Sequence, residues 1–374
     1  MLRKTPLHAL HVASGARMVD FAGWEMPLSY PGGPIEEHRL VRRSAGLFDV
    51  SHMGRFELSG PRARSDLQRI VSADIDGLKP NTSTYALLCR HDGGVLDDLF
   101  IYRLSRGDSP VFLVVANAAN RDKDHAWIRD HLRSAELRDV SDETSMLAFQ
   151  GPGALLVMDR LTAGAASKTP RLGAAELRIS DLPAPFSHAT MTVGRTGYTG
   201  EDGVELFVPA RTAPAVWERI LSEAEAAGVE AGPVGLAARD SLRFEPGFPL
   251  YGHELTEEIT PLEARLTWAC DLDKEFIGRD AIRERVDRGL ETKLATVTMT
   301  ERGLPRQGYR VLKDGEPVGL VATGMYAPTV DAFCANVFVP PALAKVGVDV
   351  DIEIRGRTKR AVVVKRPLYK PAYR

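Results

Sequence analysis

The chain has 374 residues, of which 44% are hydrophobic and 26% are charged, with a formal net charge of −2. This length predicts two or three domains, and the composition excludes intrinsically disordered and fibrous proteins. The near-zero net charge gives no overall field that attracts nucleic acid, so we expect no nucleic-acid partner. The three cysteines are far apart and form no C-x-x-C pair, which argues against a disulfide framework and a structural zinc site.

The N-terminus lacks the apolar stretch of roughly 7–15 residues that a secretory signal needs. The most apolar run, residues 111–116, is much shorter than the ~20 residues of a membrane-spanning helix. We therefore expect no membrane partner and a cytoplasmic, reducing location.

Helix and strand signals alternate along the first 290 residues. Thr5-Pro6 predicts the start of a short helix that ends near Val12, because threonine caps helices and proline suits their first position. The pattern then predicts an extended segment over 18–26, a strand over 47–58, and helices over 35–43, 120–132, 215–227 and 235–245. Because the strands cluster in hairpins without regular alternation with helices, the fold class is α+β.

The C-terminal part has a different character. From about Lys293 short strands follow one another, with Lys313-Asp314-Gly315 as a hairpin turn and apolar residues alternating with acidic ones over 348–354. Strands of this spacing without long helices predict a small β-barrel or sandwich domain.

Two adjacent carboxylates stand on a strand that is otherwise apolar. By alternation, Asp98 shares a face with Leu96, Phe100 and Tyr102, and Asp97 lies on the opposite face. A carboxylate among apolar neighbours must be paired, solvated or functional. The pattern leaves open whether both aspartates are simply solvated at a sheet edge, and which of them faces a ligand.

A glycine-rich loop, residues 194–203, precedes another strand. It lacks the G-K-[ST] of a phosphate loop and leads into a strand, so a nucleotide site is a weak interpretation. Glu205 and Phe207 share one face of that strand, and the carboxylate could accept two hydrogen bonds from a flat heterocycle with adjacent N–H donors. An ordinary solvent-facing Glu205 with locally packed Tyr198 explains the pattern equally well.

Arg239 and Arg243 lie one helical turn apart and could hold an anionic ligand, or pair with acidic neighbours such as Asp240 or Glu245. None of the histidines forms an H-E-x-x-H pair, and His52 has no recognisable serine and aspartate relay. The sequence therefore offers no metal site and no hydrolytic triad.

Taken together, these segments resemble the T-protein, or aminomethyltransferase, family of the glycine cleavage system. The resemblance covers roughly residues 5–370. It rests on six motifs in the family's order, which are Met18–Pro27, Gly46–Gly54, Gly93–Asp98, Phe149–Pro152, Arg195–Gly203 and Pro249–His253.

The resemblance implies a three-domain cloverleaf around a central folate site. The first α+β domain would comprise residues 1–52 and 140–250, the second 53–139 and 251–287, and the C-terminal barrel-like domain 288–374. It also implies that Asp98 is the catalytic carboxylate. The residues at folate-binding positions would be Met53, Tyr85, Asp98, Tyr198, Glu205 and Arg239, with no metal.

The implied reaction transfers the methylene of an aminomethyl group on lipoylated H-protein to tetrahydrofolate and releases ammonia. A fixed carboxylate suits it, because carbon–nitrogen cleavage develops positive charge. The Pro31–Pro34 loop, Arg265 and Thr329–Phe333 depart from the family pattern, so a paralogous folate-dependent demethylase acting on a small methylated substrate stays an alternative. A folate-binding iron–sulfur maintenance protein is a second alternative, although its cysteine motif is replaced here by Arg195-Thr-Gly-Tyr-Thr-Gly200.

Overall fold

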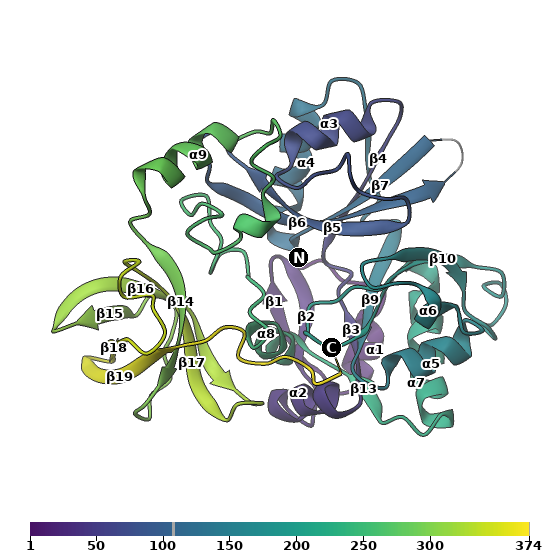
Figure 1. The fold of residues 1–374 in the computed structure, drawn as a ribbon. Coiled ribbons are helices and arrows are strands. Elements are labelled where there is room, and N and C mark those ends of the chain that lie inside the picture. The colour runs from purple at the N-terminus through teal and green to yellow at the C-terminus, as the bar shows by residue number, and fades with distance from the viewer. Residues whose placement is uncertain (107–108, 374) are drawn as a thin grey trace. The chain divides into compact units, whose positions relative to one another are not determined.

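The computed structural model describes residues 1–106 and 109–373 (Figure 1). Its contacts divide the chain into two compact units. Unit 1 comprises Met1–Asp66, Gly77–Thr84 and Phe100–Leu242, and unit 2 comprises Leu67–Asp76, Tyr85–Leu99 and Arg243–Arg374. Both units are discontinuous in sequence. The division into three parts implied by the family motifs stays a prediction.

A six-stranded sheet forms the centre of unit 1. Its strand order is β10 (Ala174–Arg178), β11 (Thr190–Gly194), β12 (Gly203–Pro209), β9 (Thr144–Gln150), β3 (Ala45–Asp49) and β13 (Ala231–Pro233). The neighbours are antiparallel except for β13, which runs parallel to β3. A separate hairpin pairs β1 (Arg17–Phe21) with β2 (Trp24–Ser29).

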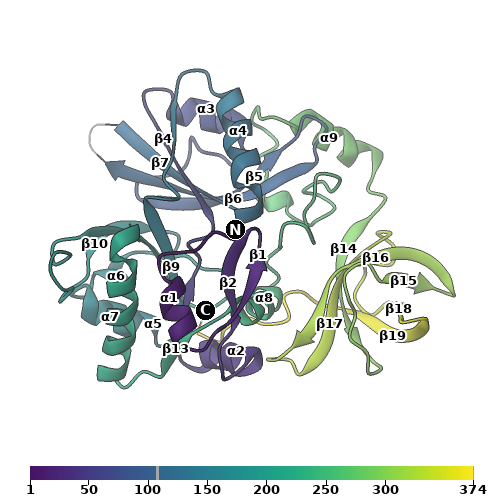
Figure 2. The same cartoon turned by 180° about the vertical axis from the view of Figure 1, so that it is seen from behind.

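The two faces of this sheet pack into different hydrophobic clusters. Leu147 and Leu206 face helices α5 (Ala154–Leu161), α6 (Ala165–Lys168) and α7 (Ala213–Ala226), which lie together in both ribbon views (Figures 1 and 2). Ala148 and Phe207, one residue further along each strand, pack with Tyr102 and Leu113 on the other face. Because side chains alternate along a strand, Glu205 lies on the same face of β12 as Phe207, two residues later, and this face is toward Tyr102.

A five-stranded sheet has the order β5 (Thr82–Cys89), β6 (Val95–Arg106), β7 (Ser109–Ala116), β4 (Gly54–Ser59) and β8 (Glu136–Asp139). Strand β6 is antiparallel to β7, and β4 is antiparallel to both β7 and β8. The remaining helices are α1 (His8–Ala13), α2 (Pro34–Arg43), α3 (Ala63–Ile70), α4 (Arg121–His131), α8 (Leu236–Phe244) and α9 (Arg279–Arg288). Short 3₁₀ turns are η1 (Ala118–Asn120), η2 (Ala210–Thr212) and η3 (Thr267–Ala269). None of the helices described is long and apolar enough to cross a membrane.

Unit 2 contains a closed six-stranded barrel. Its order is β14 (Lys293–Met299), β17 (Ala332–Val339), β16 (Glu316–Ala327), β15 (Arg310–Lys313), β18 (Asp349–Ile354) and β19 (Arg357–Val364). Alternate residues such as Val297, Val337 and Ile352 point inward and form its core. Closure removes exposed sheet edges, which explains how so small an all-β segment is stable.

The structure confirms the mixed helix and strand class and the C-terminal barrel. The predicted helices over 35–43, 120–132 and 215–227 match α2, α4 and α7 within two residues at each end. The single strand over 47–58 was wrong. The chain turns at residues 50–53, where the Asp49 carboxylate accepts the Ser51 amide at 2.9 Å and divides the segment into β3 and β4.

Arg265 adopts a left-handed backbone conformation, with φ of 61°. This conformation costs an L-residue about 1–2 kcal/mol, and glycine would remove that strain. Glycine also has a larger conformational entropy in the unfolded chain, which lowers the gain in stability by about 0.5–1 kcal/mol. We expect Arg265→Gly to raise the free energy of unfolding by about 0.5–1 kcal/mol in urea titrations. The matched control, Ala281→Gly inside α9, should lower it by about 1 kcal/mol. A loss of stability in Arg265→Gly would contradict this expectation.

Candidate active site

The two carboxylates of β6 have different environments. Asp97 is fully buried, whereas Asp98 is partly exposed. Asp98 accepts a hydrogen bond from the Tyr85 hydroxyl at 3.1 Å. Alternation along β6 produces this difference, and it makes Asp98 the member of the pair that a dissolved ligand can reach.

Tyr85 connects Asp98 to an exposed aromatic residue of unit 2. The ring of Trp268, in η3, stacks on the ring of Tyr85 with a centroid distance of 5.4 Å and an interplanar angle of 28°. Trp268 could not be predicted from the sequence, because a tryptophan in a short 3₁₀ turn gives no periodic signal. Asp98, Tyr85 and Trp268 form one continuous cluster.

Glu205, in β12 of unit 1, is buried and held through one oxygen. Its Oε2 accepts hydrogen bonds from the Thr196 hydroxyl at 2.5 Å and the Tyr102 hydroxyl at 3.0 Å. Burial and the nearby Glu205 charge raise the pKa of Tyr102 well above its ordinary value, so Tyr102 stays a neutral donor. Among the residues described, no donor to Oε1 is recorded, and this oxygen keeps its acceptor capacity.

Gly194 creates the space through which Tyr102 reaches Glu205. Gly194 lies directly opposite Glu205 in the β11 and β12 pairing. A Cβ atom at Gly194 would lie 2.6 Å from the Tyr102 ring, far closer than carbon atoms approach. Gly194, the first glycine of the glycine-rich loop, is therefore required for the packing of Tyr102. Tyr102 itself was foreseeable only as a residue on the same face of β6 as Asp98.

Gln150, at the end of β9, fixes the loop between Gly194 and Glu205. Its side-chain amide donates to the carbonyl oxygens of Thr196 and Val204, both at 3.1 Å, and its Oε1 accepts the Thr199 hydroxyl at 3.2 Å. The side chain is fully buried. One residue thereby holds both ends and the middle of the glycine-rich loop.

We expect Gln150→Glu to disorder this loop, because a carboxylate cannot donate to the two carbonyl oxygens and would bury an unpaired charge. The free energy of unfolding should fall by about 2–4 kcal/mol in urea titrations. The exposed Gln307→Glu is the control: it loses one hydrogen bond, to the Gly252 carbonyl, and should lower the free energy of unfolding by about 1 kcal/mol or less. Equal stability of Gln150→Glu and the wild type would refute the role assigned to this residue.

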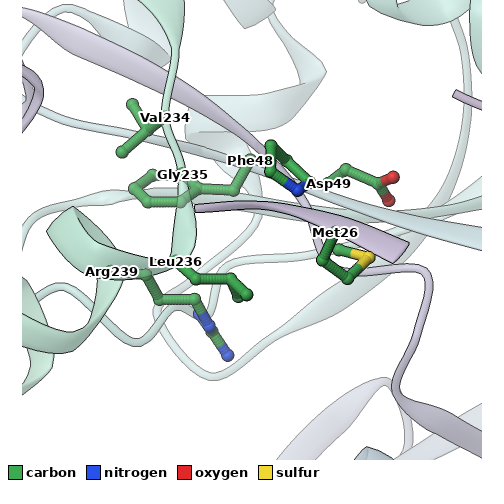
Figure 3. A pocket seen from close by; sticks show the side chains of 8 residues that line it. Met26, Phe48, Asp49, Val234, Gly235, Leu236 and Arg239 are labelled. Atoms are coloured by element: carbon green, nitrogen blue, oxygen red, sulfur yellow. The ribbon is translucent and has the colours of Figure 1, made fainter. Parts of the chain in front are cut away.

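Arg239 and Tyr198 lie together in unit 1. The Arg239 guanidinium carbon is 4.5 Å from the Tyr198 ring centroid, which is a cation–π contact. Arg239 also lines a small pocket with Met26, Phe48, Asp49 and residues 234–236, and its side chain extends from α8 along this pocket (Figure 3). The structure thus brings two of the sequence-predicted residues into contact.

Met53 lies in the turn between β3 and β4, which a buried arginine stabilises. Arg55 donates to the carbonyl oxygens of Ser51 at 3.0 Å and Met53 at 2.6 Å. Asp49 holds the other side of the turn and also accepts from His11 at 2.9 Å. These contacts position Met53, which is partly exposed.

The adjacent His52 is buried, and its Nδ1 has no hydrogen-bond partner recorded among the described residues. Burial first, and then the positive charge of Arg239, lowers the pKa of His52 to about 3. In an unfolded chain a histidine titrates near pH ~6.5. Between these two values the unfolded chain binds the extra proton, so the free energy of unfolding falls as the pH drops.

We therefore expect His52→Gln to reduce the loss of stability between pH 7 and pH 5 by about 2 kcal/mol relative to the wild type. Urea titrations at the two pH values measure it, with the exposed His188→Gln as the control that leaves the loss unchanged. An unaltered pH dependence in His52→Gln would show that this histidine does not control acid sensitivity.

Arg243 does not share the surroundings of Arg239. It is fully buried in unit 2 and pairs with the buried Glu254 at 3.0 Å. It also donates to the Phe248 carbonyl at 3.1 Å. The alternative of an ion pair with an acidic residue describes Arg243 in part, because it pairs with Glu254, but this pair is buried and does not lie on a solvated face. Within the described residues, no group of three or more potential ligands could hold a metal ion.

Comparison with known proteins identifies the family of the chain. The family described as the GCVT N-terminal domain matches residues 7–274, and the glycine cleavage T-protein C-terminal barrel domain matches residues 293–370. The chain belongs to the glycine cleavage T-protein family. It is 44% identical to the aminomethyltransferase of Symbiobacterium thermophilum over 100% of this chain and 99% of the relative.

Two further members of the T-protein family extend the comparison. The aminomethyltransferase of Desulforamulus reducens is 42% identical over 99% of this chain and 98% of the relative. The crystal structure of the glycine cleavage system aminomethyltransferase T from Bartonella henselae has a TM-score of 0.90 and 33% identity, covering 99% of both chains. This T-protein is therefore an aminomethyltransferase, and both the family and the transferase class predicted from the motifs are confirmed.

Proposed function

We propose that this chain transfers the methylene of an aminomethyl group from lipoylated H-protein to tetrahydrofolate and releases ammonia. Membership of the T-protein family supports the reaction class. The observation that carries the folate part is Glu205, whose Oε2 is fixed by two hydroxyl donors while Oε1 keeps its acceptor capacity.

The residues present fit a pterin. A pterin edge offers an N–H and an amino group side by side, and a carboxylate is the acceptor that suits two such donors. Because Thr196 and Tyr102 already occupy Oε2, Oε1 is the principal acceptor for the ligand. We assign Glu205, Tyr198, Arg239 and Met53 to folate binding. Tetrahydrofolate, when bound, supplies the nucleophilic nitrogen that receives the methylene.

Asp98 is the proposed catalytic carboxylate. Loss of ammonia from an S–CH₂–NH₃⁺ group leaves positive charge on the carbon and sulfur, and a fixed negative carboxylate stabilises that charge. The same carboxylate can accept the proton that the attacking nitrogen loses. The Tyr85 hydrogen bond keeps Asp98 in one orientation for both roles.

One of the sequence departures has a structural explanation. Thr329 donates its amide and its hydroxyl to the buried Glu245 at 2.8 and 2.6 Å, so this residue anchors the turn between β16 and β17. Arg265 occupies the left-handed conformation described above, and nothing in the structure explains an arginine there. These features act on the fold of unit 2 and supply no reason to prefer a small methylated substrate.

The test supplies tetrahydrofolate with aminomethylated, lipoylated H-protein and measures ammonia together with methylene-tetrahydrofolate. Both products should form in equal amounts. Neither should form when the lipoylated H-protein lacks the aminomethyl group. If a small methylated amine, ether or thioether alkylates the folate while aminomethylated H-protein does not, the demethylase alternative replaces the proposal.

A further inference from the structure

Helix α2 of unit 1 holds helix α8 near both of its ends. Before α8 begins, the buried Glu37 carboxylate accepts the amide of Gly235 at 2.7 Å. Near the other end, Nδ1 of the buried His38 is hydrogen-bonded to the Ser241 hydroxyl at 2.8 Å. Helix α8 carries Arg239, whose side chain extends along the pocket described above (Figure 3). The contacts of α2 therefore fix the helix from which Arg239 reaches the proposed folate site.

Arg42, in the last turn of α2, connects α8 to the glycine-rich loop. One of its guanidinium nitrogens donates to the Thr199 carbonyl at 2.7 Å and pairs with the buried Glu201 at 2.8 Å. The other terminal nitrogen donates to the Leu242 carbonyl, in α8, at 3.2 Å. The Arg42 side chain is only 9% exposed, so these contacts are shielded from water. One side chain thus bridges the loop and the helix.

The two segments that Arg42 joins carry the Tyr198 and Arg239 pair. Tyr198 directly precedes Thr199 in the loop. Arg239 lies about one helical turn before Leu242 in α8. The cation–π contact, 4.5 Å from the Arg239 guanidinium carbon to the Tyr198 ring centroid, requires that the two backbones keep a set spacing. An arginine suits this task, because its planar guanidinium presents its donors in a rigid fork.

We propose that Arg42 is a positioning residue, which sets the spacing of Tyr198 and Arg239 and thereby the affinity for the ligand that this pair holds. The proposal rests on the proposed function, in which that ligand is tetrahydrofolate. Arg42 acts through the pair, because the three acceptors described above lie in the loop and in α8. A pair that is held in place before binding loses less freedom when the ligand binds, so this preorganisation raises affinity.

The test variant is Arg42→Lys, which keeps the positive charge beside Glu201 and so avoids a buried unpaired carboxylate. A single ammonium group can replace the nitrogen that contacts the loop, but it cannot also replace the nitrogen that contacts Leu242. The variant therefore breaks the connection between the loop and α8 while the ion pair stays in place.

Arg219→Lys, in α7, is the matched control. Arg219 also bridges a backbone carbonyl and a carboxylate, because it donates to Ser180 at 3.3 Å and pairs with Glu223 at 2.7 Å. Helix α7 packs in the hydrophobic cluster on one face of the six-stranded sheet, whereas α8 packs in the cluster on the other face. The control thus has the same substitution and a similar loss of contacts, away from α8.

The first experiment measures tetrahydrofolate binding by calorimetry and turnover by initial rates. Arg42→Lys should raise the Kd for tetrahydrofolate about 3- to 30-fold, the range typical of residues that act on a site without contacting its ligand. The KM for tetrahydrofolate should rise with the Kd, while kcat stays within about 2-fold of the wild type. Arg219→Lys should match the wild type in Kd and KM. A wild-type Kd in Arg42→Lys, or an equal rise in Arg219→Lys, overturns the proposal.

A double-mutant cycle then tests whether Arg42 acts through the pair. Tyr198→Leu removes the aromatic face but keeps an apolar side chain, so binding should be weaker and still measurable. In this background, Arg42→Lys should raise the Kd by less than about 2-fold, because the spacing of a lost contact no longer matters. Equal fold-changes with and without Tyr198 would show that Arg42 acts independently of the pair, which overturns the proposal.

Hydrogen exchange of the ligand-free protein separates this proposal from the proposed function. Backbone amides of residues 195–203 and of α8 should exchange faster in Arg42→Lys than in the wild type, because the loop and the helix are no longer joined. Arg219→Lys should leave the exchange of both segments unchanged. Unaltered exchange of both segments in Arg42→Lys overturns the positioning role. If the exchange changes as expected but the wild type does not bind tetrahydrofolate, the proposed function is contradicted instead.

Discussion

Replacing Asp98 with asparagine is expected to lower turnover about 10²–10³-fold while the protein stays folded. The change keeps the shape and the hydrogen-bond acceptor for Tyr85 but removes the negative charge. A loss of this size is typical when one preorganised electrostatic group is removed from a site where charge develops. Initial rates of ammonia release with aminomethylated H-protein measure it, and near-wild-type turnover would refute the catalytic role.

Two companion variants separate charge from positioning. Tyr85→Phe removes the hydrogen bond and keeps the carboxylate, so its effect on turnover should be smaller than that of Asp98→Asn. Asp97→Asn alters a fully buried group on the other face of β6, so it should affect thermal stability more than turnover. A larger turnover loss in Asp97→Asn than in Asp98→Asn would assign the catalytic role to Asp97 and contradict its assignment to Asp98.

Local sequence signals predicted the elements that depend on local chemistry. Helix α7 has proline in its first turn and an apolar stripe, and the hairpin between β15 and β16 has glycine in its turn. The division between β3 and β4 was missed because it depends on one hydrogen bond between Asp49 and Ser51 inside an apolar run. Helix α1 begins at His8, later than Thr5-Pro6 indicated, because Thr5 instead donates its hydroxyl to Asp49 at 2.6 Å.

In the candidate site, too, local patterns were predicted correctly and long-range contacts were not. The alternation along β12 correctly separated Glu205 and Phe207 from Val204 and Leu206, because period two is a property of any strand. The partners of Glu205 are long-range. Tyr102 lies 103 positions away in sequence, and no local pattern connects the two residues. The folate-binding assignments themselves came from the family motifs and stay proposals.

Glu205 carries the prediction that tests folate binding most directly. Glu205→Ala removes the acceptor for the pterin donors and should weaken tetrahydrofolate binding by about 1–3 kcal/mol, measured by isothermal titration calorimetry. Glu205→Gln should be about as harmful as Glu205→Ala. The Thr196 and Tyr102 hydroxyls donate toward Oε2, so the amide oxygen of glutamine would occupy that position. Its NH₂ group would then face the ligand, where two donors would meet.

The control for this prediction is Thr196→Val, which removes one donor to Oε2 and leaves the acceptor Oε1 in place. Its effect on the affinity should be clearly smaller than that of either Glu205 variant, because the Glu205 carboxylate retains its hydrogen bond from Tyr102. Thermal denaturation of each variant separates lost binding from lost folding. If Glu205→Gln binds tetrahydrofolate as tightly as the wild type, Oε1 is not the pterin acceptor and the folate site must be assigned to other residues.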